Sequence, residues 1–221
     1  MRFDDMTREA VLAAIAEEKL IVIVRGVSAD RLIPLAEAMY AGGVRLLEVP
    51  YSADGRVSDE ETAEEIGMLV SQFAGRMYIG AGTVLTERQV ELTAAAGGRF
   101  IISPNTSAAV IARTRALGLV SLPGAMTPTE IEAAHEAGAD LVKLFPAGTL
   151  GPDYVKAVRA PLSHIGLLAV GRVDRENAAA YLAAGALGIG VSSGIVDKRL
   201  LASGDLAGIT RLAAAYVAAV R

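Results

Sequence analysis

Cysteine and tryptophan are both missing from this sequence of 221 residues, and histidine occurs only twice. Without cysteine, the chain can form neither a disulfide framework nor a thiolate metal site. The net charge of -4 provides no basic excess that would attract nucleic acid or an anionic membrane surface. These absences predict a protein that uses no metal cofactor, no nucleic-acid partner and no membrane.

Long apolar runs are missing as well, since no stretch reaches the length of a membrane span. The opening segment, MRFDDMTREAVLAAIAEE, carries acidic residues early and an apolar face at helical spacing. A signal peptide has a basic start and an unbroken apolar core instead. His135 falls within an expected helix and His164 in a loop, so neither belongs to a metal-binding pattern. We expect a cytoplasmic protein without a metal site.

What the sequence does contain is a repeated alternation of short apolar runs and helical segments. Eight apolar runs are expected to be strands: 20–26, 44–50, 77–82, 100–104, 119–124, 140–146, 165–171 and 187–193. Between them, apolar residues recur at helical spacing, as Leu32, Leu35 and Met39 do. Thr127 and Glu130 form a capping-box pattern, and Asp174 is expected to cap the helix that follows it.

Eight strand–helix units predict a small (β/α)8 TIM barrel with a parallel sheet and an outer layer of helices. A doubly wound open sheet is the alternative, but the first turn, VRGVSAD, lacks its G-x-G-x-x-G pattern. No proline- or serine-rich linker divides the chain, so we expect a single domain over residues 1–221. A leading helix and a C-terminal helix are expected to flank the barrel.

Two ionisable residues lie inside expected strands. Lys143, one of only four lysines, lies within the run DLVKLFPAG, and Glu48 lies within LLEVP. Because side chains alternate along a strand, Lys143 shares a face with Leu141 and Phe145, and Glu48 shares one with Leu46. If both faces point inward, an amine and a carboxylate meet inside one apolar barrel mouth.

A buried lysine–glutamate pair can serve structure alone, but burying charges costs several kcal/mol unless the geometry is good. Arg25 and Thr83 also stand at strand ends, and this concentration of polar residues favours an active site. Desolvation lowers the pKa of an amine, which can then attack a ketone and form a Schiff base. With a carboxylate to move protons and an arginine to hold a carboxylate, these groups suit C–C bond chemistry beside a keto acid.

Seven segments carry a resemblance to a known family: IVIVRGV, AGGVRLLEVPYS, IGAGTVLTERQV, IISPN, LPGAMTPTEI, AGADLVKLFPA and LLAVGRV. In this order they resemble the 2-keto-3-deoxy-6-phosphogluconate (KDPG) and 6-phosphogalactonate (KDPGal) aldolases, a family that includes 4-hydroxy-2-oxoglutarate (KHG) aldolases. Its members are class I aldolases with a (β/α)8 barrel and are usually trimeric. The resemblance implies a homotrimer that acts on a small keto acid through a Schiff base on lysine, without another cofactor.

The resemblance also implies roles for individual residues. Lys143 resembles the Schiff-base lysine. Glu48 resembles the general acid/base, which acts partly through a water that becomes the carbinolamine hydroxyl. Thr83 resembles the residue near the bound pyruvate carboxylate, and Pro104 and Phe145 resemble the apolar walls of that pocket.

One further position separates the branches of this family. Arg25 matches an arginine of the KDPGal-type members. The KDPG-type members place an arginine four residues after the glutamate, where this chain has Ser52. The chain therefore leans to the KDPGal-like branch.

Two departures from the family pattern fall where its members hold the substrate phosphate. The usual Gly-Gly after the seventh strand is Gly171–Arg172 here, and the usual Gly-Ser after the eighth is Ser192–Ser193. Backbone phosphate cradles favour glycine because a side chain blocks close approach. Gly171, Arg172 and Ser193 are expected at this end of the substrate, where Arg172 either binds a phosphate or second carboxylate directly or fills the site.

The favoured function is aldol cleavage of KDPG or KDPGal to pyruvate and glyceraldehyde 3-phosphate. The first alternative is KHG cleavage to pyruvate and glyoxylate, with Arg172 holding the distal carboxylate. A phosphate-binding barrel epimerase is the second, but the usual metal-binding histidines at strand ends are missing. A non-catalytic barrel that binds a keto acid is the third, and the intact Lys143–Glu48 pair argues against it.

Overall fold

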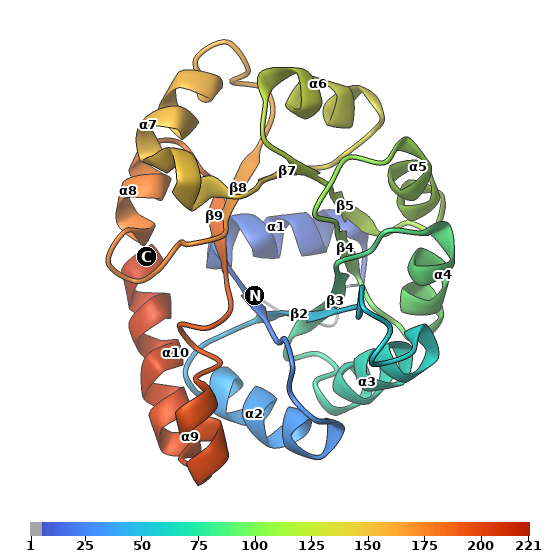
Figure 1. The fold of residues 1–221 in the computed structure, drawn as a ribbon, viewed down its shortest axis with the longest axis vertical. Coiled ribbons are helices and arrows are strands. Elements are labelled where there is room, and N and C mark those ends of the chain that lie inside the picture. Colours follow the sequence, from blue (N-terminus) through green and yellow to red (C-terminus); the bar gives the residue numbers. More distant parts are fainter. Residues whose placement is uncertain (1–5) are drawn as a thin grey trace.

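The computed structural model describes residues 6–221, in which a ring of parallel strands is surrounded by helices (Figure 1). The strands are β1 (Leu20–Ile23), β2 (Leu46–Pro50), β3 (Tyr78–Gly82), β4 (Phe100–Ile102), β5 (Val120–Leu122), β6 (Gly124–Ala125), β7 (Val142–Leu144), β8 (Leu167–Val170) and β9 (Gly188–Val191). The helices are α1 (Arg8–Glu18), α2 (Ala29–Ala41), α3 (Asp59–Gln72), α4 (Glu87–Ala95), α5 (Ala108–Ala116), α6 (Pro128–Glu136), α7 (Ala147–Arg159), α8 (Ala178–Ala183), α9 (Lys198–Ser203) and α10 (Leu206–Val220).

The sheet curls into a nearly closed barrel, and its two edge strands are consecutive in the chain. The strand order is β5-β4-β3-β2-β1-β9-β8-β7-β6. Only Pro123 separates β5 from β6, and its nitrogen has no hydrogen to donate to the ladder. The Ser121 carbonyl of β5 also accepts the N–H of Asp140, just before β7, at 3.0 Å. With β5 and β6 counted as one barrel strand, the predicted (β/α)8 barrel is confirmed.

Helix α1 closes the end of the barrel where the strands begin. In Figure 1 it crosses the centre of the ring behind the strands. Val11, Ala14 and Ile15 of α1 are buried among inward-facing side chains such as Leu46 and Tyr78, the first residues of their strands. This apolar contact fills the barrel floor, so a ligand reaches the interior from the opposite end.

Asp140, immediately before β7, attaches α1 to the barrel. Its carboxylate accepts hydrogen bonds from the side chains of Arg8 in α1 and Arg115 in α5, and from the Ser121 amide at 2.9 Å. Burial raises the pKa of Asp140, although the Ser121 amide and Arg8 lower it. These contacts fix the start of the strand that carries Lys143.

The outer helices follow the sequence pattern. Leu32, Leu35 and Met39 of α2 are fully buried against the barrel, as predicted. The last helix, α10, packs along α2 and completes the outer layer (Figure 1). Along residues 6–221, no helix has the length and apolar character that crossing a membrane requires.

The two predicted helix starts have different outcomes. The capping box of Thr127 and Glu130 at α6 is confirmed. The prediction that Asp174 caps a helix is wrong, because α8 begins four residues later with Asn177 as its N-cap. Asp174 and Asn177 instead exchange two hydrogen bonds, of 3.0 and 2.9 Å, which close a turn after β8.

Candidate active site

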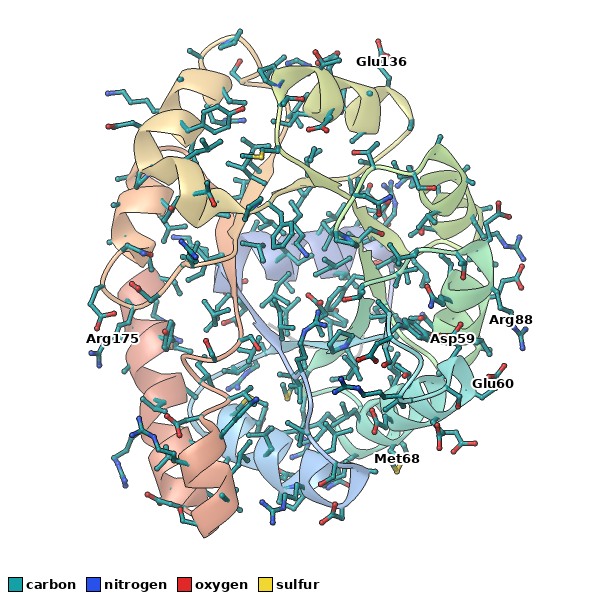
Figure 2. The ribbon with its side chains drawn as sticks, in the orientation of Figure 1. Asp59, Glu60, Met68, Arg88, Glu136 and Arg175 are labelled. Carbon is teal, nitrogen blue, oxygen red and sulfur yellow. The ribbon has the colours of Figure 1, made fainter. Side chains whose placement is uncertain are left out.

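A cavity of about 640 Å³ opens at the C-terminal ends of the strands. Charged side chains such as Glu60, Arg88 and Glu136 project outward from the helix layer, away from this central space (Figure 2). The structure brings all nine predicted site residues to the cavity lining: Arg25, Glu48, Thr83, Pro104, Lys143, Phe145, Gly171, Arg172 and Ser193.

Lys143 enters the cavity from the middle of β7, where it is paired with Gly124 of β6 and Leu168 of β8. The residue is only 7% exposed, and its Nζ lies 4.7 Å from the centroid of the Phe145 ring. Burial lowers the pKa of Lys143, the charge of Glu48 raises it, and Arg25 lowers it further. An amine shifted in this direction is more often neutral, and therefore nucleophilic, near neutral pH.

Glu48 reaches the same cavity from β2, where it is paired with Gly80 of β3. It is 2% exposed, and a methyl group on Gly82 would lie 1.6 Å from its Oε1 atom. Glycine at position 82 therefore makes room for the carboxylate. Burial raises the pKa of Glu48, while the positive charges of Lys143 and Arg25 lower it. A carboxyl group with a raised pKa can take up and release a proton during a reaction.

Arg25 and Thr83 meet beside this pair. Arg25 follows β1, and its Nη2 donates a hydrogen bond of 2.9 Å to the hydroxyl oxygen of Thr83. Thr83 follows β3 with a φ of +53°, which is uncommon for a β-branched residue and is typically retained at functional sites. A guanidinium and a hydroxyl held together in this way offer two donors to a carboxylate.

Pro104 and Phe145 form apolar walls of the cavity. The Phe145 ring covers Gly171, since a methyl group on Gly171 would lie 3.2 Å from the ring. The main chain on either side is fixed by a hydrogen bond of 2.8 Å from the Gly148 amide to the Gly171 carbonyl. The Phe145 ring lies against the Lys143 amine and contributes to the burial that lowers its pKa.

Arg172 and Ser193 stand at the exposed rim of the cavity. Arg172 has a φ of +55°, a conformation that glycine adopts without strain, and its carbonyl accepts a hydrogen bond from Asn177 at 3.2 Å. The neighbouring Ser192 donates its hydroxyl to the Ile23 carbonyl at 2.9 Å and so joins β9 to β1. The rim thus combines one cation with a hydroxyl, a composition that suits an anionic group.

Further residues that the sequence interpretation did not place at the site also line the cavity, among them Asp174, in the turn after β8, and Tyr216, in α10. The sequence around Asp174 does contain a local pattern, but that pattern predicts a helix cap. No local pattern marks Tyr216, because only the packing of the last helix brings it to the strand ends.

The two histidines lie elsewhere. Their rings stack edge to face with centroids 5.2 Å apart, between α6 and the loop before β8, and neither lines the cavity. In the part of the chain that the structure describes, no group of three or more histidine and carboxylate side chains is placed to hold a metal ion.

A model of the KDPG and KHG aldolase family matches residues 11–212. The chain belongs to this family. As a KDPG/KHG aldolase family member it is a lyase. The match spans the whole barrel from α1 to α10, including all the strands that carry the cavity residues.

Relatives of this aldolase support the same placement. It is 38% identical to the probable 2-dehydro-3-deoxy-6-phosphogalactonate aldolase of Rhizobium meliloti, over 86% of this chain and 87% of the relative. It is 37% identical to the 2-dehydro-3-deoxy-6-phosphogalactonate aldolase of Escherichia coli, over 79% of this chain and 82% of the relative. Among solved structures, the KDPG aldolase of Legionella pneumophila, with pyruvate captured as a covalent carbinolamine, superposes with a TM-score of 0.82 at 27% identity, covering 92% and 96% of the two chains.

Proposed function

We propose that this aldolase cleaves KDPGal or KDPG to pyruvate and glyceraldehyde 3-phosphate through a Schiff base on Lys143, as one domain over residues 1–221. The observation that carries the proposal is the buried pair of Lys143 and Glu48, which line one cavity and oppose each other's pKa shift. The captured carbinolamine in the Legionella pneumophila relative supports the same chemistry.

In the proposed reaction, neutral Lys143 attacks the C2 ketone and gives a carbinolamine, which loses water to become an iminium. Glu48, directly or through a water, removes the proton of the C4 hydroxyl. The C3–C4 bond then breaks, its electron pair moves into the iminium to form an enamine, and the aldehyde leaves. Protonation of the enamine at C3 and addition of water at C2 release pyruvate and restore the amine.

The other cavity residues are proposed to bind the two ends of the substrate. Arg25 and Thr83 hold the carboxylate next to the ketone, because their hydrogen-bonded side chains present donors beside Lys143. Pro104 and Phe145 enclose the pyruvate half. Gly171, Arg172 and Ser193 are proposed to hold the phosphate at the cavity rim.

KDPGal is the favoured substrate of the two. The relatives at 38% and 37% identity both carry the phosphogalactonate name. Arg25 also stands at the position expected for that branch, whereas Ser52 replaces the arginine of the other. Cleavage assays with the two C4 epimers, compared by kcat/KM, test this preference.

KHG cleavage to pyruvate and glyoxylate is a second candidate, and Arg172 is the observation that favours it. A guanidinium at the rim can hold a carboxylate as well as a phosphate. The Arg172→Gly variant separates the two: if the arginine obstructs the phosphate, turnover of the phosphorylated substrate improves, and if it holds the phosphate, turnover collapses. A loss confined to KHG turnover supports the second candidate.

The decisive experiment traps the Schiff base. We expect incubation with pyruvate and borohydride to add one reduced pyruvyl group to Lys143, detected by intact mass and peptide mapping. Lys143→Met should abolish the adduct, while Lys156→Met, which removes an exposed lysine of α7, should not. No adduct on the unaltered chain, together with full activity of Lys143→Met, would rule out the proposal.

We also propose that the enzyme works in the cytoplasm as a homotrimer, with a small-molecule keto acid as its only partner and no cofactor beyond its own lysine. The resemblance to usually trimeric aldolases supports the assembly.

A further inference from the structure

Helix α10 is the last element of the chain, yet it contributes to the cavity at the strand ends. Its Tyr216 is 5% exposed and lines the cavity together with Asp174 and Gly194. The helix packs against α2, α8 and α9, so it lies beside the turns that follow β8 and β9 (Figure 1). This tyrosine takes no direct part in the proposed reaction.

The first contact of Tyr216 is with the turn after β9. A methyl group on Gly194 would lie 1.9 Å from the Tyr216 hydroxyl oxygen, so the hydroxyl packs directly against the main chain at this glycine. The same turn is held from the other side by the hydrogen bond of Ser192 to the Ile23 carbonyl. Ser193, between these two contacts, is thereby fixed at the cavity rim.

The second contact of Tyr216 is with the turn after β8. Tyr216 lines the cavity together with Asp174 of this turn. Burial raises the pKa of the Tyr216 hydroxyl, and the nearby main-chain amide of Arg175 lowers it. The Arg175 side chain projects away from the barrel and pairs with Glu176 at 2.8 Å (Figure 2). The Tyr216 hydroxyl therefore faces the main chain of this turn, three residues after Arg172.

We infer that Tyr216 is a positioning residue for the aldehyde half of the substrate. Its hydroxyl joins the turn that carries Arg172 to the turn that carries Ser193, and so sets the distance between the two rim groups proposed to hold the distal anion. The inference rests on the proposed function, but it concerns a residue that acts through the main chain of others.

The part of the site proposed for pyruvate and the part proposed for the distal anion are formed by different elements. The groups proposed for the pyruvate half lie on β2 and β7 or follow β1, β3, β4 and β7, whereas the Tyr216 hydroxyl faces the turns after β8 and β9. Loss of its hydroxyl should weaken recognition of the distal anion and leave chemistry at the pyruvate carbon intact.

The test uses Tyr216→Phe in the full chain, which removes one oxygen atom. Exchange of pyruvate methyl protons in D2O reports the pyruvate half, and we expect it to stay within about twofold of the unaltered protein. In the synthesis direction, kcat/KM for glyceraldehyde 3-phosphate divided by that for glyceraldehyde reports anion recognition. We expect this ratio to fall about tenfold, the effect of one lost hydrogen bond in a positioned site.

Tyr51→Phe is the matched control. Tyr51 is also buried, but its hydroxyl donates to the Gln89 carbonyl in α4, away from both turns. We expect Tyr51→Phe to change thermal stability without changing the aldehyde ratio.

An unchanged ratio in Tyr216→Phe overturns the inference, as does an equal loss of both activities. If Tyr216→Phe does not fold, Gly194→Ala, which forces a methyl group against the same hydroxyl, must lower the ratio for the inference to stand. An unaltered protein that exchanges no pyruvate protons would instead overturn the proposed function, so the two failures are distinguishable.

Discussion

The charges of Lys143 and Glu48 are both disfavoured by their surroundings. Burial lowers the pKa of Lys143. The stability that this residue contributes is therefore fully present above its unfolded pKa of 10.5, and it is lost as the pH falls through the folded pKa. Burial raises the pKa of Glu48, whose contribution is present below its unfolded value of 4.5 and is lost as the pH rises through its folded pKa. At neutral pH each group in its charged form therefore lowers the free energy of unfolding.

Replacing both groups should separate stability from activity. We expect Lys143→Met/Glu48→Gln to melt about 3–6 °C above the unaltered protein at pH 7, because replacing two buried groups of opposite charge commonly gains about 1–2 kcal/mol. The single Lys143→Met variant should gain less, since it removes one of the two positive charges that act on Glu48. Calorimetry of the three proteins checks this, and a double variant that melts at or below the unaltered protein contradicts it.

Arg25 tunes the same amine from the side of the cavity. Its positive charge lowers the pKa of Lys143, so Arg25→Met should raise that pKa and keep the amine protonated to higher pH. We expect the acid limb of the pH profile for Schiff-base trapping with cyanoborohydride to move to higher pH. Arg88→Met, at an exposed arginine on α4, should leave the profile in place. A limb that moves equally in both variants would refute the electrostatic role of Arg25.

At the scale of elements, the flanking helix α1 forms the floor of the barrel. The barrel interior tapers to apolar side chains where the strands begin, and α1 covers them with Ile15, which is 1% exposed. Such a contact contributes stability through burial, at a distance from the reacting atoms.

Shortening Ile15 should therefore lower stability and spare the chemistry. We expect Ile15→Ala to lower the free energy of unfolding by about 2–4 kcal/mol, because it leaves a cavity in a packed core. Leu12→Ala, at a partly buried position of the same helix, should cost less. Urea titration measures both, and KM for the keto acid should be unchanged. A large rise in KM for Ile15→Ala would show that α1 shapes the site itself.

The sequence predicted elements well where a local pattern determines them. The eight strands appear at the expected places with shorter ends, because the terminal residues of each run turn away from the sheet to form the loops. The alternation rule grouped Glu48 with Leu46 and Lys143 with Leu141, and in the structure both faces point into the barrel. The capping prediction at Asp174 failed because the same residue types also close an Asx-type turn.

Contacts between elements that are distant in the chain could not be predicted from local sequence patterns. Tyr216 is one of six tyrosines, and nothing near it in the sequence distinguishes it from a helix residue that packs in the core. The residues around Asp140 do not indicate that it pairs with Arg8, which lies in a helix far away in the chain. Both depend on how α1 packs across the floor of the barrel and α10 packs in the outer layer.

At the scale of the whole molecule, the outer surface carries several exposed apolar residues, among them Met68 and Leu117. In the proposed homotrimer, apolar residues of the helix layer are the groups that an interface would cover. We expect light scattering after gel filtration to give three times the chain mass of 22.8 kDa. A mass equal to one chain across micromolar concentrations would exclude the trimer.

The closed floor also has a kinetic consequence. With α1 across one end, the cavity has a single mouth, and Lys143 lies deep within it while Arg172 stands at the rim. In the proposed reaction the aldehyde leaves from the rim before pyruvate, which stays attached to Lys143 until the Schiff base is hydrolysed. Cleavage should therefore follow an ordered one-substrate, two-product scheme, in which pyruvate inhibits competitively against the sugar acid and the aldehyde inhibits non-competitively.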